Sequence, residues 1–398
     1  MNLESFYFLL TPAGQSQLSI LAESDIDAAN HLHLAGHLSR EVGPERAHAL
    51  LETTLLRRRA AGKFSRAAEM YFTREALQQA SSETVSGYRA RRFAEAGYEQ
   101  VADLGCGIGG DALALAESAE VIGVEWDPIR LAMAQENLRV YGRGHRFLPL
   151  QADLLELSPL PVEALFADPG RRDEHGRRIF SVYKYRPPLT FLDGWRKMAP
   201  HQAVKISPGV AYEELPLEAE VEFISVAGEV REAVLWFGDL RGPVARRATL
   251  LPGEFSMTDD MPAETPIREP LAYLYEPDGA IIRAHLVEQL ACLLNAAKID
   301  KDIAYLTADR RQETPFARCY ALEDSFPFQL KRLRAYLRER GIGQVTVKKR
   351  GSPIDPDELR RRLRLKGERQ CTIFLTRVQR RPMVLIGQPA ATDQGHAS

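Results

Sequence analysis

Between Gln100 and Phe237, short apolar runs alternate with stretches of helical spacing, and this rhythm constrains the fold more than any other feature. The runs cover residues 101–104, 121–124, 147–150, 164–167 and 203–206. Strands that alternate with helices form a parallel sheet flanked by helices. Two further runs, 221–226 and 233–237, flank Gly228 and leave no room for the crossover that parallel strands need. We therefore predict an α/β domain over residues 98–242, with a mostly parallel sheet ending in an antiparallel hairpin.

A glycine-rich segment follows the first predicted strand and leads into a helix. Gly105, Gly107 and Gly109 let the backbone approach a ligand without Cβ clashes. Gly105, Gly107 and Gly110 also satisfy the G-x-G-x-x-G pattern of dinucleotide-binding loops, so the glycines alone leave two cofactor classes open. We interpret Cys106, within this loop, as a small packing residue and not as a catalytic thiol.

Three acidic residues near successive strand ends separate the two cofactor classes. Asp103 precedes the glycine loop, Glu125 ends the second strand, and Asp153 follows the third. Ligands bind at this carboxyl edge in such sheets. There Asp103 can position the amino group of a methionine-derived cofactor, Glu125 can accept both ribose hydroxyls, and Asp153 can accept from the adenine amine. We predict S-adenosyl-L-methionine as the cofactor and keep a nicotinamide cofactor as the alternative.

The fourth strand ends in Asp168-Pro-Gly-Arg-Arg172, beside which methyl transfer occurs in sheets of this class. We expect Asp168 to act as a hydrogen-bond acceptor or general base, and Arg171 and Arg172 to clamp a phosphate or carboxylate. The alternative for the arginines is a loop-ordering ion pair with Asp173 or Glu174. Amine-methylating enzymes usually add a second proline and an aromatic residue here. Here the aromatic residue is missing and two arginines replace it, which puts methylation of a base amine in doubt without excluding it.

Two nearby segments bear on the substrate. The fifth strand ends in Lys205-Ile-Ser-Pro-Gly209 without a cysteine, which argues against methylation at C5 of a pyrimidine, because that reaction needs a thiol nucleophile. Lys184 and Tyr185 belong to a short basic and aromatic stretch that we expect to neutralise and stack on a nucleic acid. An ordinary amphipathic segment is the alternative.

Residues 1–97 show helical periodicity, and we predict a helical N-terminal domain. Its basic cluster (Arg57, Arg58, Arg59, Lys63 and Arg66) is either a solvated helix face or a substrate-facing patch. Residues 243–317 carry little pattern. We expect a linker-like loop at 255–270, a helix at 282–297 and a strand at 303–307.

Residues 318–388 predict a small α+β domain, followed by a disordered tail at 389–398. We expect strands near 318–322, 344–348, 371–377 and 383–386, and helices at 328–340 and 356–365. Asp355 precedes Pro356 as a good N-cap, with proline in the first turn.

This last domain is strongly basic. Residues 331–381 carry about 17 Lys and Arg against about 5 Asp and Glu, in a chain whose formal net charge is −2. Such asymmetry favours a polyanionic partner, and we expect RNA, with Lys348, Lys349 and Arg350 in contact with it. The alternative is that this domain pairs with an acidic neighbour in the same chain.

The four cysteines, at positions 106, 292, 319 and 371, are too far apart to form a metal-ligand pair, and their scarcity fits a reducing compartment. No apolar stretch approaches the roughly 18 residues of a membrane span. We therefore expect a cytoplasmic protein with neither a metal centre nor a membrane segment.

Several motifs together resemble a known family. They are Arg57-Arg-Arg-Ala-Ala-Gly-Lys-Phe64, Tyr71-Phe-Thr-Arg-Glu-Ala-Leu77, Tyr88-Arg-Ala-Arg-Arg-Phe93, Asp103-Leu-Gly-Cys-Gly-Ile-Gly-Gly110, Asp168-Pro-Gly-Arg-Arg172 and Val345-Thr-Val-Lys-Lys-Arg-Gly351. With them, nearly the whole chain resembles bacterial class I methyltransferases that carry a C-terminal THUMP-like domain. The resemblance implies a Rossmann-like sheet, an RNA substrate such as tRNA or rRNA, and a ferredoxin-like insert before the last domain.

The sequence thus predicts an S-adenosylmethionine-dependent RNA methyltransferase whose basic C-terminal domain docks the substrate. Two alternatives stay open. One is a methyltransferase acting on a small molecule or a protein. The other is a non-catalytic RNA-binding protein with a vestigial methyltransferase fold.

Overall fold

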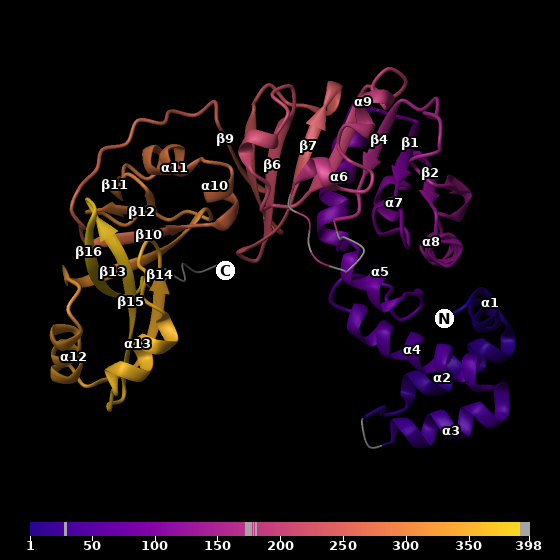
Figure 1. The fold of residues 1–398 in the computed structure, drawn as a ribbon, viewed down its shortest axis with the longest axis horizontal. Helices are drawn as coiled ribbons and strands as arrows, with labels where there is room; N and C mark the ends of the chain where they lie inside the picture. The colour runs from indigo at the N-terminus through magenta and orange to yellow at the C-terminus, as the bar shows by residue number, and fades with distance from the viewer. Residues whose placement is uncertain (28–29, 172–176, 178, 180, 391–398) are drawn as a thin grey trace, which may run out of the picture. The chain divides into compact units, whose positions relative to one another are not determined.

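The computed structural model describes all residues of the chain except 28–29, 172–176, 178, 180 and 391–398 (Figure 1). The chain forms two compact units. The first comprises Met1–Glu220 and Ala233–Pro243, and the second comprises Val221–Glu232 and Val244–Ser398. The chain passes between them within the hairpin of β6 (Glu220–Val226) and β7 (Glu229–Phe237).

The N-terminal part of the first unit is helical, as predicted. Its helices are α1 (Leu3–Leu10), α2 (Pro12–Glu23), α3 (His31–Val42), α4 (Pro44–Ala60), α5 (Arg74–Gln79) and α6 (Glu83–Ala96). Side-chain caps fix several boundaries. The Thr11 hydroxyl accepts from the Gly14 amide at 3.1 Å to start α2, and Thr73 accepts from the Ala76 amide at 3.1 Å to start α5. Gly97, with φ of +77°, ends α6 in the left-handed conformation.

Two residues of the predicted basic cluster, Arg58 and Lys63, bind carbonyl groups near helix ends. Arg58 Nη2 donates to the Leu21 carbonyl at the end of α2 at 3.2 Å, and Lys63 Nζ donates to the Leu77 carbonyl in α5 at 2.7 Å. The last carbonyls of a helix lack partners within the helix, and cationic donors satisfy them. Two members of the cluster are therefore structural anchors, a role that neither a solvated face nor a substrate patch describes.

The sheet of the first unit confirms the predicted topology. Its strands lie in the order β3-β2-β1-β4-β5-β7, and β7 neighbours β6 in the hairpin. The first five are parallel, and β7 runs antiparallel to β5. They are β1 (Gln100–Leu104), β2 (Glu120–Glu125), β3 (Phe147–Gln151), β4 (Ala164–Ala167) and β5 (His201–Ile206), with helices α7 (Gly110–Leu115), α8 (Pro128–Val140) and α9 (Phe191–Trp195). This is a Rossmann-like sheet, in which the ends of β1, β2 and β4 share one edge.

The second unit corrects the prediction for residues 243–317. Strands β8 (Arg246–Leu251) and β9 (Phe255–Thr258) follow the hairpin, so the predicted loop at 255–270 begins with a strand. The single helix expected at 282–297 is wrong. Two short helices, α10 (Gly279–Arg283) and α11 (Val287–Leu293), replace it, because the backbone turns left-handed at His285 and again at Asn295. Helical periodicity does not reveal such breaks.

The ferredoxin-like insert is also corrected. Strands β10 (Tyr273–Pro277), β11 (Ala297–Asp300) and β12 (Ile303–Ala308) join the C-terminal strands in one seven-stranded sheet. Its order is β11-β12-β10-β13-β16-β15-β14. The C-terminal strands are β13 (Ala317–Pro327), β14 (Ile342–Lys349), β15 (Arg369–Val378) and β16 (Arg381–Pro389). Residues 273–308 thus extend the sheet of the last domain and do not form a separate fold.

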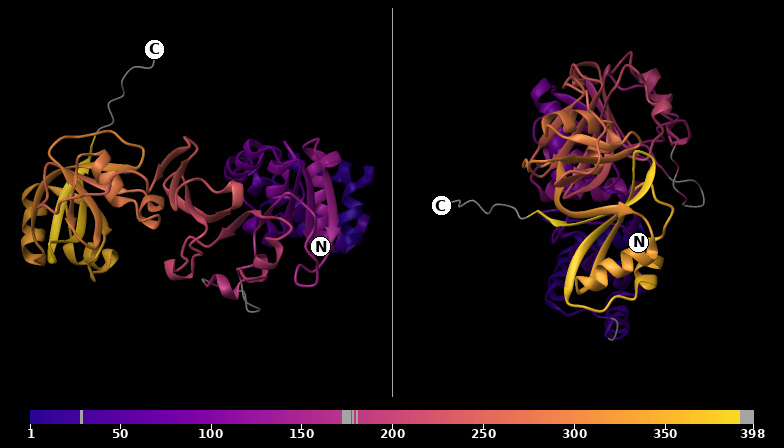
Figure 2. Two further views of the ribbon diagram at one scale, coloured as in Figure 1. Left: turned by 90° about the horizontal axis from the view of Figure 1, so that it is seen from above. Right: turned by 90° about the vertical axis from the view of Figure 1, so that its left-hand side faces the viewer.

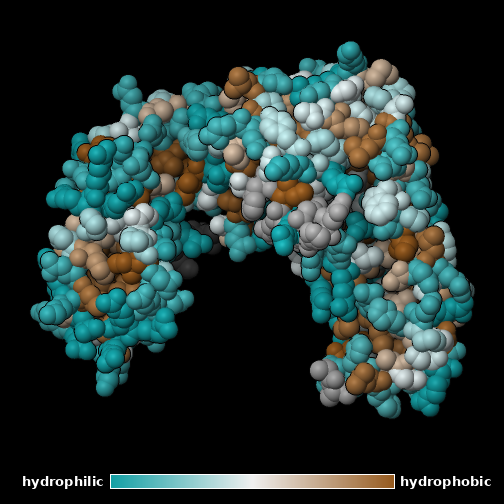
Figure 3. All heavy atoms as spheres, viewed as in Figure 1, coloured by the Kyte–Doolittle hydropathy of each residue, from teal (hydrophilic) through white to brown (hydrophobic). Residues whose placement is uncertain are grey.

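Helices α12 (Leu330–Glu339) and α13 (Pro356–Leu363) pack beside the yellow C-terminal strands (Figure 2). Leu333, Leu337, Leu359 and Leu363 are buried in one core with β15 and β16, while the surface over the two helices is largely hydrophilic (Figure 3). The Asp355 cap is confirmed, since its carboxylate accepts from the Glu358 amide at 2.9 Å. Most of the predicted tail, residues 391–398, lies outside the described residues. In the described ranges, no helix combines the length and apolar character needed to cross a membrane.

Candidate active site

A cavity of about 490 Å³ lies at the carboxyl ends of β1, β2, β3 and β4 in the first unit. Its volume suits a small organic ligand, for which pockets of about 300–1,000 Å³ are usual. Four loops after successive strands contribute, and α5 adds Ala76 and Gln79 from the helical part of the chain. The loop residues include Gly105, Cys106, Gly107, Ile108, Glu125, Trp126, Asp153, Leu154, Leu155, Asp168, Pro169, Gly170 and Arg186.

Two glycines of the first loop have different roles. Gly107 has φ of +55° and lines the cavity, and a Cβ built there meets no atom within 4 Å. Its bare backbone leaves room for a ligand. Gly109 has φ of +83°, but a Cβ built there comes within 2.9 Å of Leu138 Cδ2 on α8. Gly109 is not among the residues that line the cavity, so its small size serves helix packing.

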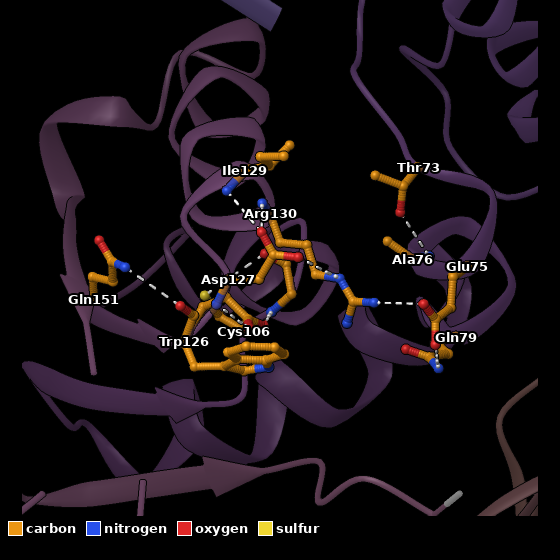
Figure 4. A network of polar contacts seen from close by, with 12 residues as sticks. Thr73, Glu75, Ala76, Gln79, Cys106, Trp126, Asp127, Ile129, Arg130 and Gln151 are labelled. Atoms are coloured by element: carbon orange, nitrogen blue, oxygen red, sulfur yellow. Dashed lines mark hydrogen bonds and ion pairs between the residues drawn. The ribbon is translucent and has the colours of Figure 1, made fainter. Parts of the chain in front are cut away.

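Glu125 is held at the end of β2 by two backbone amides. Its carboxylate oxygens accept from the Gly107 amide and the Asp127 amide, each at 3.0 Å, and the side chain is 5% exposed. Burial raises the pKa of Glu125, while the two amide hydrogen bonds oppose the shift. Trp126 follows directly and is 71% exposed, an unusual fraction for a tryptophan beside a cavity (Figure 4).

Asp103 is buried without a hydrogen-bond partner. Its side chain is 1% exposed, and within the described residues neither carboxylate oxygen has a partner. Burial raises the pKa of Asp103 well above its usual range, and the nearby charges of Asp111 and Asp168 raise it further, while the charge of Arg89 opposes the shift. Asp111 lines the cavity and Asp103 does not. A buried carboxyl group that lacks a partner fits a site completed by a cationic ligand group, which would reach Asp103 through water.

Replacement of Asp103 by asparagine should stabilise the ligand-free protein at neutral pH by about 1–2 kcal/mol, because a buried, unpaired ionisable group is removed. A carboxyl group whose pKa is raised by folding stabilises the fold below its unfolded pKa, and this contribution is lost as the pH rises through the folded pKa. The advantage of Asp103→Asn should therefore shrink as the pH falls. Thermal unfolding of both proteins at several pH values tests this, and a variant less stable than wild type at pH 7 contradicts it.

Asp153 takes its predicted place at the cavity. It is exposed, and its Oδ1 accepts from the Leu155 amide at 2.9 Å. The turn thereby presents Asp153, Leu154 and Leu155 to the cavity together. Polar and apolar groups of this kind suit the edge and the faces of a purine ring.

Asp168 ends β4 and pairs with a residue that the sequence did not single out. Its Oδ2 accepts from Lys205 Nζ at 2.6 Å, and the side chains are 22% and 5% exposed. The following loop is closed by two backbone hydrogen bonds between Gly170 and Arg186, at 2.8 and 3.1 Å. Arg171 does not line the cavity, and Arg172 lies outside the described residues.

Several predicted substrate contacts are placed differently from expectation. Tyr185 is buried and its hydroxyl accepts from the Ser207 amide at 3.1 Å, so its ring offers no free stacking surface, whereas Lys184 is exposed. In the second unit, Lys348 pairs with Glu276, and Arg350 donates to the Ala304 carbonyl at 3.5 Å. Lys349 is exposed. Alternation along a strand sends neighbouring side chains to opposite faces, which separates Lys349 from the other two.

Cys106 has the structural role that was expected. It is buried, and burial raises the pKa of its thiol well above the usual range, with the carboxyl groups of Asp103 and Glu125 adding to the shift. A thiol held neutral is a poor nucleophile. In the part of the chain that the structure describes, no group of three or more His, Cys, Asp or Glu residues is arranged to hold a metal ion.

Sequence reasoning missed the contribution of α5 to the site. Arg130, at the start of α8, pairs with Glu75 of α5 at 2.9 Å, and this contact holds α5 against the cavity (Figure 4). No local pattern reports a pairing across 55 positions. For Trp126 there was a usable signal, because a large aromatic residue directly after the acid of β2 has to lie near the ligand edge.

Three segments of the chain match known protein families. Residues 98–186 match a family model described as RNA cap guanine-N2 methyltransferase, residues 317–389 match one described as THUMP domain-like, and residues 2–60 match a domain of unknown function. Two uncharacterised S-adenosylmethionine-dependent methyltransferases from strains of Mycobacterium tuberculosis are 39% identical over 350 residues, which cover 84% of this chain and 94% of theirs.

Two further matches are more distant. The trimethylguanosine synthase of Schizosaccharomyces pombe is 27% identical over 172 residues, which cover 37% of this chain and 69% of that protein. A crystal structure of a candidate methyltransferase from Porphyromonas gingivalis superposes with a TM-score of 0.72 at 21% identity, covering 92% of this chain and all of that one. The latter match supports the fold over both units.

Proposed function

This chain belongs to the family of bacterial class I S-adenosylmethionine-dependent methyltransferases that carry a C-terminal THUMP-like domain, and on that premise we propose that it methylates RNA. S-adenosylmethionine is its cofactor. The observation that carries the proposal is the pairing of an intact cofactor cavity with a strongly basic THUMP-like domain. The names of the guanine-N2 family model and of the trimethylguanosine synthase support RNA as the substrate class.

We assign the cofactor to the cavity of the first unit. Glu125 would accept the ribose hydroxyls and Asp153 the adenine amine, while Asp111 and the buried Asp103 would balance the ammonium group. The cofactor supplies a methyl group that its sulfonium centre activates. Trp126 is exposed at the cavity edge, where its ring can cover the adenine.

At the acceptor side, we propose that the loop at the end of β4 binds an exocyclic amine of a base. Oδ2 of Asp168 accepts a hydrogen bond from Lys205. The partly exposed carboxyl group of Asp168 lines the cavity next to Pro169. A carboxylate oxygen and a backbone carbonyl are the acceptors that two N–H bonds of an amine require. An aromatic residue after the proline is lacking in this chain, so the base has to stack on another group.

The basic C-terminal helices are the proposed docking surface. Arg360 and Arg362 pair with acids of their own helix, α13. Other basic residues on and after α12 and α13 are exposed and suit phosphate contacts: Lys331, Arg338, Arg361, Arg364 and Lys366. Phosphate neutralisation makes binding fall with salt, at a slope of about 0.7–0.9 per contact.

Methyl transfer from labelled cofactor to total RNA of a deletion strain tests the function. We expect label in RNA, and a modified nucleoside that mass spectrometry finds in wild-type cells and not in the deletion strain. Label confined to the protein or small-molecule fraction would replace RNA by another substrate class. No binding of S-adenosylmethionine in calorimetry would favour the vestigial, non-catalytic alternative.

A triple replacement, Lys331→Gln, Arg338→Gln and Arg361→Gln, should weaken RNA binding and lower the salt slope by about 2, since about three phosphate contacts are lost. The cofactor affinity should stay unchanged, because these residues belong to the other unit. Filter binding at several salt concentrations measures the slope.

The matched control replaces three basic residues of the first unit, Arg40, Arg59 and Arg139, by glutamine, which keeps the change in net charge the same. If both triple variants change the slope equally, the effect is one of net charge and the proposed docking surface is rejected.

A further inference from the structure

A network of hydrogen bonds connects the loop at the end of β4 to the helical part of the first unit, and its central residues are Lys205 and Ser81. Lys205 Nζ, on β5, donates to Asp168 Oδ2 at 2.6 Å and to Ser81 Oγ at 3.2 Å. Ser81 also accepts from Arg89 Nη2 at 2.7 Å and donates to Asp111 Oδ2 at 3.2 Å. Arg89 in turn pairs with Asp111. These hydrogen bonds therefore connect Asp111, which lines the cofactor cavity, to Asp168 at the end of β4.

Ser81 is saturated in this arrangement. A hydroxyl group has one proton to donate and two lone pairs. The Ser81 proton goes to Asp111, and the two lone pairs face Arg89 and Lys205. Lys205 is almost fully buried, so its charge depends on these protein partners and not on water. Its Nζ has little freedom to follow Asp168 if that side chain rotates.

We propose that Lys205 is a positioning residue for methyl transfer, which fixes the Asp168 carboxylate so that Oδ1 is left for the acceptor. This inference rests on the proposed function for the identity of the acceptor. The charge-assisted bond on Oδ2 is short, and such bonds set the orientation of the group that they join. Asp168 lines the cavity with a side chain that is 22% exposed, while Lys205 lies behind it.

The pair also decides the route of the proton. Attack of the acceptor nitrogen on the methyl carbon would form the N–C bond and break the C–S bond of the cofactor, whose electron pair would stay on sulfur as a neutral thioether. The methylated nitrogen then has to lose one proton. Uptake by Asp168 would leave Lys205 as a buried cation without a counter-charge, which is costly. Release to water leaves the pair of Asp168 and Lys205 balanced. Asp168 is then a hydrogen-bond acceptor throughout the reaction and not the final proton carrier.

Lys205→Met tests the positioning role, because methionine keeps the length and removes the charge. We expect kcat to fall about tenfold to a hundredfold, the cost of a misplaced catalytic group, while the dissociation constant of S-adenosylmethionine changes less than twofold. Lys205→Arg should recover part of kcat. The control is Arg92→Met, which breaks the partly buried pair with Glu220 (2.9 Å) in the same unit and should leave kcat unchanged.

A double-mutant cycle separates positioning from general damage. In an Asp168→Asn background, Lys205→Met should cost less than twofold further in kcat, since its partner carboxylate is gone. Losses that multiply would overturn the proposal, and so would an unchanged kcat in Lys205→Met alone.

A second readout does not depend on turnover. Crystal structures of ligand-free variants should show the Asp168 carboxylate moved in Lys205→Met and kept in place in Lys205→Arg. An unmoved carboxylate in Lys205→Met overturns the proposal. If wild-type protein methylates no RNA, the proposed function fails, and these structures still decide the role of Lys205.

Discussion

Asp168→Ala should lower kcat by about a hundredfold to a thousandfold, with the cofactor still bound. The replacement removes both carboxylate oxygens, one of which accepts from Lys205 and the other of which we assign to the acceptor group. Removal of one preorganised hydrogen-bonding group from a reaction site typically lowers kcat by about 10²–10³. Single-turnover methylation of RNA at saturating cofactor measures the loss.

The variant also leaves Lys205 buried without its acid, so a stability loss has to be separated from a catalytic one. Thermal unfolding with and without S-adenosylmethionine reports on folding and on cofactor binding. Asp239→Ala is the control, because this acid of the same unit is 82% exposed at the side chain. If Asp168→Ala retains a kcat within threefold of wild type, Asp168 has no direct part in the reaction.

Glu125→Ala should weaken S-adenosylmethionine binding by about a hundredfold. Two hydrogen bonds between a carboxylate and the ribose hydroxyls are worth about 3 kcal/mol together, which corresponds to this factor. The variant also deprives the Gly107 and Asp127 amides of the acceptor that holds them at 3.0 Å. Isothermal titration with S-adenosylmethionine gives the dissociation constant.

Glu120→Ala is the matched control for Glu125→Ala, because Glu120 begins the same strand and is exposed away from the cavity. Its affinity should equal that of wild type. Glu125→Gln keeps the size of the side chain and one acceptor oxygen, so its affinity for S-adenosylmethionine should lie between those of Glu120→Ala and Glu125→Ala. An unchanged affinity in Glu125→Ala would show that the ribose lies elsewhere.

The gathering of the proposed cofactor residues around one cavity could be predicted because its signals are local. A strand of four to six apolar residues ends in an acid or a glycine loop, and parallel strands bring such ends to one edge. Hence Gly107, Glu125, Asp153 and Asp168 all line one cavity. Gly109 had the same local pattern but packs on Leu138, since the sequence shows that a residue is small and not which neighbour requires it.

The rest depended on pairings between distant residues. Strand β5 carries His201, Gln202 and Lys205, and nothing in the sequence sets Lys205 apart until Asp168, 37 positions earlier in the chain, is placed beside it. The same limit applies to basic residues counted by sequence. Charge counting foresaw a basic domain, but Lys348 is paired with Glu276, 72 positions earlier. Net charge is a sum over residues, whereas docking depends on which of them stay exposed.

The hydroxyl of Ser81 limits how this catalytic sheet can be exchanged during evolution. It lies before α6, outside the segment 98–186 that matches a methyltransferase family model, yet it bonds Lys205 on β5 and Asp111 on α7. A recombination event that joined the sheet to a new N-terminal region would deprive Lys205 of the Ser81 hydroxyl, and Asp111 of both Ser81 and Arg89. We therefore expect relatives to keep the helical segment that carries Ser81 and Arg89 together with this sheet, even where the THUMP-like domain is replaced by another domain.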